Sequence, residues 1–175
     1  MKRLALLLNA LLVAACQKQS GFQDPFTRPQ IDWKPGLQLN VDEATRILGN
    51  PSRLEKTTAY LNDSITTYQT AFRDDWIDPA TGKTGVLYYM YEEWPSVAAA
   101  KSYLDNTLIE NRVSPGNGTI MTGGAELHYL IGDPVVRMAM VCKENRLIRV
   151  KVNQVTSRYS VGEFRKVVES LAERL

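Results

Sequence analysis

The stretch Ala125–Val155, AELHYLIGDPVVRMAMVCKENRLIRVKVNQV, decides the fold class of this chain of 175 residues. It contains three apolar runs, Ala125–Ile131, Val135–Cys142 and Leu147–Val155, which are separated by Gly-Asp-Pro and Lys-Glu-Asn. Connectors this short join antiparallel strands, because a parallel pair needs a crossover of about a dozen residues or more. The stretch therefore predicts three consecutive antiparallel strands.

The middle and last runs differ in how their apolar residues are spaced. Val135–Cys142 is apolar at almost every position, which is typical of a central strand that is covered on both faces. In the last run apolar and polar residues alternate: the apolar residues are Ile148, Val150 and Val152, and the polar ones are Arg149, Lys151 and Asn153. This alternation predicts a strand with one face in the core and the other in water.

Two earlier strand patterns, Thr66–Arg73 and Val86–Tyr91, lie on either side of the stretch DPATGKTG (78–85), and a weaker one covers Thr57–Leu61. The Gly-Lys-Thr in this stretch matches the end of a phosphate-binding P-loop. That motif also needs a glycine at the position of Ile77 and a helix after the threonine. A strand pattern follows instead, and Pro and Gly favour a tight turn. We expect the tip of a β-hairpin here and no bound nucleotide.

Three segments carry the signals of amphipathic helices. The first begins at Asn40 with a capping box and stops at Gly49. The second runs from Ser96 to about Asn111, and the third begins at Ser160 and continues to the last residue. Together the patterns predict an α+β fold with about three helices packed on a mostly antiparallel sheet, in the order α-β(2–3)-α-β(3)-α.

The first sixteen residues are typical of a bacterial export signal. Met1-Lys2-Arg3 is positively charged, and the apolar run Leu4–Ala15 is too short to cross a membrane, which takes about 20 apolar residues. The end of the run, Leu-Val-Ala-Ala before Cys16, resembles the lipobox of bacterial lipoproteins. The resemblance implies that residues 1–15 are a signal peptide and that Cys16 carries a diacylglycerol and an N-acyl lipid after cleavage. The alternative is an ordinary secretory signal beside an unrelated cysteine.

Lipidation of Cys16 implies anchorage to a membrane outside the cytosol, because two or more acyl chains hold a protein there stably. Gln17 favours the outer membrane, facing the periplasm, over the inner membrane. We expect no other cofactor. Residues 16–35 lack periodicity and are expected to form a flexible tether before a single domain at 36–175. The aromatic residues of the tether are expected to dock on the domain or on a partner: Phe22, Phe26 and Trp33.

The charge of the chain argues against nucleic acid as a partner, and its cysteine content argues against a disulfide within the chain. The signal segment holds two of the 21 basic residues and none of the 19 acidic ones, so the rest of the chain is formally neutral. Nucleic acid is therefore not expected as a partner, because binding it requires a basic surface. With Cys16 acylated, Cys142 has no partner for a disulfide within the chain.

Side chains suited to catalysis are few. His128 is the one histidine of the chain and shares a strand face with Glu126, while Cys142 shares a face with Val136 and Met140. This pattern predicts a buried and inert thiol, and a Cys142–His128 nucleophile pair is the alternative.

The carboxylates near the hairpin lack the spacing of a calcium site: Asp74, Asp75, Asp78, Glu92 and Glu93. We expect them to form a solvated acidic rim and expect no metal site. A carboxylate-based hydrolase is the alternative.

Aromatic residues gather on or beside the hairpin. Trp76, Tyr89, Tyr91 and Trp94 are the candidate contacts for a ligand or partner, because such sites are enriched in aromatic side chains. If Tyr89 and Tyr91 face a groove, they line a site for a small apolar ligand or an envelope protein. Packing of these side chains in the core is the simpler interpretation.

Three segments of the domain resemble small bacterial lipoprotein domains of unknown function with a PsbP-like α+β sandwich. They are EATRILGNP (43–51), YYMYEEWPSVAAAKSYL (88–104) and NRLIRVKV (145–152) followed by FRKVVESLAERL (164–175). The resemblance carries over no catalytic residue. We therefore expect a membrane-anchored extracytoplasmic lipoprotein that acts as a non-enzymatic binding or accessory module in the cell envelope. The alternative is an envelope hydrolase that uses a thiol or carboxylates.

Overall fold

The computed structural model describes residues 28–112, 119–132 and 135–175. The predicted signal peptide, the lipidation site Cys16, residues 16–27 of the predicted tether, and with them Phe22 and Phe26, lie outside these ranges. In the described part of the chain, no helix has the length and apolar character needed to span a membrane.

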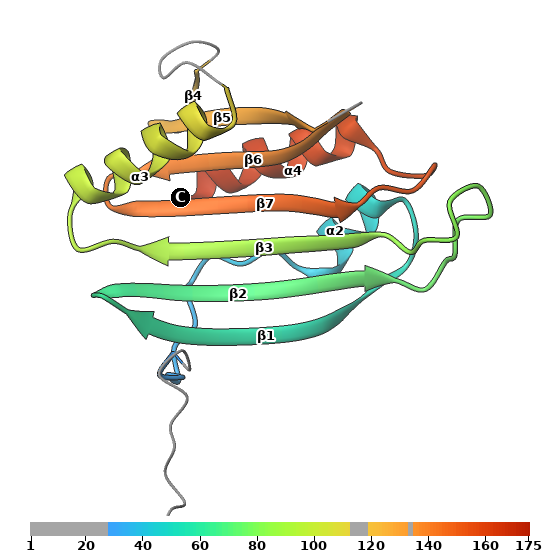
Figure 1. The fold of residues 1–175 in the computed structure, drawn as a ribbon, viewed down its shortest axis with the longest axis horizontal. Helices are drawn as coiled ribbons and strands as arrows, with labels where there is room; N and C mark the ends of the chain where they lie inside the picture. Colours follow the sequence, from blue (N-terminus) through green and yellow to red (C-terminus); the bar gives the residue numbers. More distant parts are fainter. Residues whose placement is uncertain (1–27, 113–118, 133–134) are drawn as a thin grey trace, which may run out of the picture.

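An antiparallel sheet of seven strands forms the centre of the described part (Figure 1). The strands lie in the order β1-β2-β3-β7-β6-β5-β4, and each neighbouring pair is antiparallel. Their bounds are β1 Ser52–Asn62, β2 Ile65–Asp74, β3 Val86–Glu93, β4 Ile120–Thr122, β5 Ala125–Gly132, β6 Val135–Lys143 and β7 Arg146–Gln154. Three helices accompany them, α2 Val41–Leu48, α3 Val97–Glu110 and α4 Val161–Arg174. For the described residues, an α+β fold with three helices and a mostly antiparallel sheet is confirmed.

The sheet contains more strand than the sequence patterns predict. Strand β4 follows α3, so four strands rather than three lie between α3 and α4. Its three residues are too few for an alternating pattern to be recognised. Strand β1 has 11 residues and extends well beyond the predicted Thr57–Leu61. The sequence pattern misses the rest of the strand because most side chains of β1 are exposed at the sheet edge, so they do not alternate between apolar and polar.

Strands β2 and β3 form the predicted hairpin around DPATGKTG. At the tip, the backbone N–H of Asp78 donates to the carbonyl of Lys83 at 2.8 Å. Gly82 has a φ of 66°, a left-handed conformation that glycine adopts without strain. Strand β3, not a helix, follows Thr84. The interpretation as a turn is therefore confirmed.

Helices α2 and α4 cover one face of the sheet and lie behind it in Figure 1. Their buried side chains are Ala44, Ile47 and Leu48 of α2 and Phe164, Val167, Val168, Leu171 and Ala172 of α4. Ile148, Val150 and Val152 of β7 pack into the same cluster, while Lys151 and Asn153 are exposed on the other face. The predicted alternation of β7 is confirmed, and this face carries the main core.

Helix α3 lies on the opposite face, in front of the sheet in Figure 1. Its buried side chains Ala100, Leu104 and Leu108 pack against β5, β6 and β7 in a second, smaller core. The sheet residues of this core are Leu130, Met140, Cys142 and Leu147. The two faces are therefore covered unequally, by two helices and by one.

A bulge changes which side chains of β6 share a face. The register between β5 and β6 shifts after Leu130, so Val136 packs in the main core while Met140 and Cys142 lie under α3. The prediction that Cys142 and Val136 share a face is wrong, because one inserted residue reverses the alternation. The predicted shared face of Cys142 and Met140 is confirmed.

The end of the predicted tether is packed against the domain. Gln30 forms an isolated β-bridge with Tyr60 at the outer edge of β1. The ring of Trp33 lies 5.8 Å from that of Tyr91, centre to centre. The expected docking of Trp33 on the domain is confirmed: residues 29–31 pair with the edge strand β1, and Trp33 packs against the main core.

Candidate functional site

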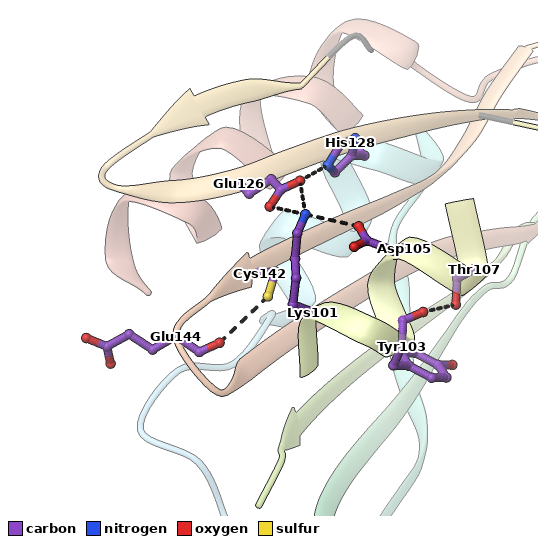
Figure 2. A network of polar contacts seen from close by, with 8 residues as sticks. All are labelled: Lys101, Tyr103, Asp105, Thr107, Glu126, His128, Cys142 and Glu144. Carbon is purple, nitrogen blue, oxygen red and sulfur yellow. Dashed lines mark hydrogen bonds and ion pairs between the residues drawn. The ribbon is translucent and has the colours of Figure 1, made fainter. Parts of the chain in front are cut away.

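A cluster of charged side chains joins α3 to strand β5 (Figure 2). Lys101 Nζ lies 2.7 Å from both carboxylate oxygens of Glu126 and 3.0 Å from Asp105 Oδ1. His128 Nε2 lies 2.7 Å from the same Glu126 carboxylate. These contacts fix one side of α3 to the sheet.

The charges of this cluster support each other. Burial is the largest single influence and alone would raise the pKa of Glu126 and lower the pKa of Lys101, but the hydrogen bonds and charges of their neighbours together outweigh it. The pKa of Glu126 is therefore lowered and that of Lys101 is raised, and both groups stay charged at neutral pH. An ion pair held in this way is suited to position α3 and not to transfer protons.

Cys142 lies under α3 with 7% of its surface exposed, as the sequence predicts for a buried thiol. Burial raises the pKa of the thiol, and the negative charge of Glu126 raises it further. The Nε2 atom of His128 binds the Glu126 carboxylate and not the thiol (Figure 2). The geometry of a Cys142–His128 nucleophile pair is therefore not formed.

The prediction of a solvated acidic rim is wrong for Asp74, Asp78 and Glu92, which are 0%, 1% and 8% exposed. Asp74 accepts hydrogen bonds from the backbone N–H of Gly85 at 2.9 Å and from the amide of Asn50 at 3.2 Å. Asp78 accepts from the backbone N–H of Ser157 at 3.0 Å, which ties the hairpin to the segment between β7 and α4. Asp74 and Asp78 hold distant segments together.

The charge of Asp78 is stabilised by its donors. Burial alone would raise its pKa, but hydrogen bonds from Ala80, Thr81 and Ser157 lower it below its ordinary value. Asp75 is exposed, as predicted, and pairs with Arg53 at 3.1 Å.

The four aromatic residues predicted as candidate contacts lie in three separate places. Tyr89 and Tyr91 are 0% and 5% exposed in the main core, where the simpler interpretation puts them. Trp76 is half-buried beside the hairpin. Trp94 stacks on Tyr103 of α3 with ring centres 4.8 Å apart. Of the four, Trp94 borders the groove beside α3.

This groove follows from the unequal covering of the sheet. Six spacings of about 4.8 Å make seven strands about 29 Å wide, whereas a helix with its side chains is about 10 Å across. Helix α3 contacts β6 and β7, so the side of this face formed by β2 and β3 stays open beside it. The cavity between them has a volume of about 620 Å³. A second cavity of about 410 Å³ continues it toward Trp94.

Two cross-strand rows run along the floor of the groove, and all of their residues line it except the buried Ala71 and Met140. One row is Ala71, Tyr88, Lys151 and Met138, and the next is Gln69, Met90, Arg149 and Met140. Tyr103, Asn106 and Thr107 of α3 form the wall. Each cation therefore stands between an apolar side chain of β3 and a methionine of β6.

Arg149 is held toward the groove by uncharged partners. Its guanidinium donates to the hydroxyl of Tyr103 at 3.1 Å and lies 2.9 Å from the sulfur of Met90. Among residues 28–112, 119–132 and 135–175, neither Arg149 nor Lys151 forms an ion pair within 4.0 Å. Burial raises the pKa of nearby Glu92, and the charge of Arg149 partly opposes this rise. The floor thus presents two cations that lack a paired carboxylate in the described part.

Sequence reasoning did not find Arg149, Lys151 and Tyr88 as site residues. The signal that was present is the polar alternation of β7, which places Arg149 and Lys151 on the same face. Whether that face meets water or a cavity depends on the position of α3, which local periodicity does not encode.

Residues 28–112, 119–132 and 135–175 contain no group of three or more His, Cys, Asp or Glu side chains placed to hold a metal ion.

Comparisons of the chain with models of protein families, with curated proteins and with solved structures found no match. Its function is therefore inferred from its own residues and geometry.

Proposed function

We propose that this chain is a membrane-anchored lipoprotein of the bacterial envelope and a non-enzymatic binding module, with the groove beside α3 as its binding site. The lipobox resemblance at Cys16 supports the lipid anchor, and Gln17 supports the outer membrane, facing the periplasm. One observation carries the binding role. The groove has a volume of about 620 Å³, which lies within the range of about 300–1,000 Å³ for small-molecule sites.

The proposed relationship to PsbP-like lipoprotein domains agrees with this role. In an α-β-α-β-α order, helices lie on both faces of the sheet. A face that is covered by a single helix stays partly open. The partner is a small ligand with apolar character, and an envelope protein is the other candidate.

An envelope hydrolase is the second candidate function, and the positions of its proposed residues weigh against it. Cys142 is buried with a raised pKa, which lowers the fraction of reactive thiolate. Asp74 and Asp78 are buried and already accept several hydrogen bonds. A binding role needs none of these groups.

Filling the groove should weaken binding of Nile red, a neutral apolar dye. Asn106 is exposed and lines the cavity, so in Asn106→Trp an indole occupies part of the groove without disturbing the core. We expect the affinity for the dye, measured by fluorescence titration, to fall about tenfold, which corresponds to about 1.4 kcal/mol.

Ser102→Trp is the matched control, because Ser102 is exposed one turn earlier on α3 and does not line the groove. Its dye affinity should equal that of the unchanged chain. Equal affinities of all three proteins would contradict the proposed site.

A further inference from the structure

We propose that the ligand of the groove is a small anionic amphiphile. Its carboxylate, sulfate or phosphate head binds Arg149 and Lys151, and its apolar body lies on the tyrosine and methionine side chains of the floor. This inference rests on the proposed binding role and adds the chemical class of the ligand.

The head group is inferred from the two cations. Arg149 and Lys151 are two residues apart on one strand, so they share a face and their Cα atoms lie about 6.6 Å apart. Both side chains are long enough to reach one anionic group between them. The guanidinium of Arg149 is already oriented by Tyr103 and Met90, and neither of these partners carries a charge. An anion in the groove would supply the charge that both cations lack.

The apolar body is inferred from what flanks the cations. Tyr88 and Met138 stand on either side of Lys151 and line the cavity, and Met90 lines it beside Arg149. Methionine side chains adapt to ligands of different shape, and aromatic rings give apolar contact area. A free inorganic anion would leave these surfaces unused.

Two carboxylates border the groove and limit where the head group binds. Glu110 is exposed at the end of α3 and lines the larger cavity. Glu92 is buried in the adjoining cavity, where the indole of Trp94 donates to it at 3.4 Å. Because both carboxylates repel an anion, the head group is expected between Arg149 and Lys151, away from Glu110 and Glu92.

Three probes test this ligand class with the purified full chain by isothermal titration calorimetry, below the concentrations at which they form micelles. Decanoate has an anionic head and an apolar chain, decyltrimethylammonium has the same chain with a cationic head, and propionate has the anionic head with a short chain. We expect decanoate to bind at least about tenfold more tightly than either of the others. Decyltrimethylammonium lacks the hydrogen-bonded charge pair and propionate lacks the apolar burial, and each of these contributes about tenfold or more to the affinity.

Substitutions of the two cations then locate the head group. Arg149→Met and Lys151→Met should each weaken decanoate binding at least about fivefold, since each removes one charge-assisted contact. Lys151 is exposed, so its substitution keeps the test valid if Arg149→Met fails to fold. Lys83→Met is the matched control, because Lys83 is an exposed lysine at the hairpin tip. Its affinity for decanoate should not change.

The outcomes separate this inference from the proposed function. If decyltrimethylammonium binds as tightly as decanoate and Asn106→Trp weakens both, the groove is a binding site but the ligand is not selected by its negative charge. If propionate binds as tightly as decanoate, the site takes small anions and the inferred apolar body is wrong. If no probe and no Nile red binds, both the inference and the proposed function are wrong.

Discussion

Cys16→Ser should abolish the incorporation of labelled palmitate, whereas Cys142→Ser should be labelled as strongly as the unchanged chain. The chain has two cysteines, so the two variants test each thiol in turn. Cys142 is buried under α3 and is not accessible for acylation. The lipobox resemblance assigns the lipid to Cys16, and serine lacks the thiol that carries it. The measurement is the label per unit of protein after growth with labelled palmitate.

The energetic consequence of losing the lipid is large. Each buried CH₂ of an acyl chain contributes about 0.8 kcal/mol, and a protein with one chain or none is not stably anchored. A cleaved Cys16→Ser chain should therefore leave the membrane fraction, with more than about tenfold less protein in the pellet. If this variant keeps its palmitate label and remains as membrane-bound as the unchanged chain, the proposed anchor is wrong.

Gly49→Ala should destabilise the domain by about 3 kcal/mol or more, the largest effect we expect from a single methyl group. Gly49 ends α2 with a φ of 75°, and a Cβ there would overlap the backbone carbonyl of Arg158. Alanine in this left-handed conformation costs about 1–2 kcal/mol, and the overlap adds a backbone shift to that cost. The shift would also separate Arg158 from the side chain of Asn50, to which it donates at 2.6 Å.

Gly82→Ala is the matched control for this substitution. Gly82 has a similar φ of 66°, but nothing lies within 4 Å of a Cβ added there. Gly82→Ala should therefore lower the free energy of unfolding only by the cost of the left-handed conformation, about 1–2 kcal/mol. Both free energies of unfolding are measured by urea denaturation. Equal losses for the two variants would show that the close approach of Gly49 to Arg158 does not contribute.

The sequence predicts those elements whose signals are local. The alternation of Ile148 with Arg149 sets the two faces of β7, the turn residues at 78–82 set the hairpin, and the capping residues Asn40 and Ser160 set the start of two helices. Each of these features depends on residues within a few positions of one another. Short-range patterns are sufficient for them.

Features that depend on distant segments were not predicted. The partners of Asp78 include Ser157, which is 79 positions away, so the sequence around Asp78 reads as an exposed acidic turn. The bulge before Met138 is equally hidden, because its neighbours remain apolar on both faces. The groove is the clearest case. It exists because α3 covers one part of a sheet face, and that position is set by the packing of Leu104 and Leu108.

The central claim is that the groove beside α3 binds an anionic amphiphile, and methyl NMR of the methionines tests it most directly. Met90 and Met138 line the groove, while Met121 lies on the edge strand β4 with 65% of its surface exposed. Titration with decanoate should shift the methyl signals of Met90 and Met138, saturate at a one-to-one ratio, and leave Met121 unchanged. Shifts at Met121 without shifts at Met90 and Met138 would contradict the claim.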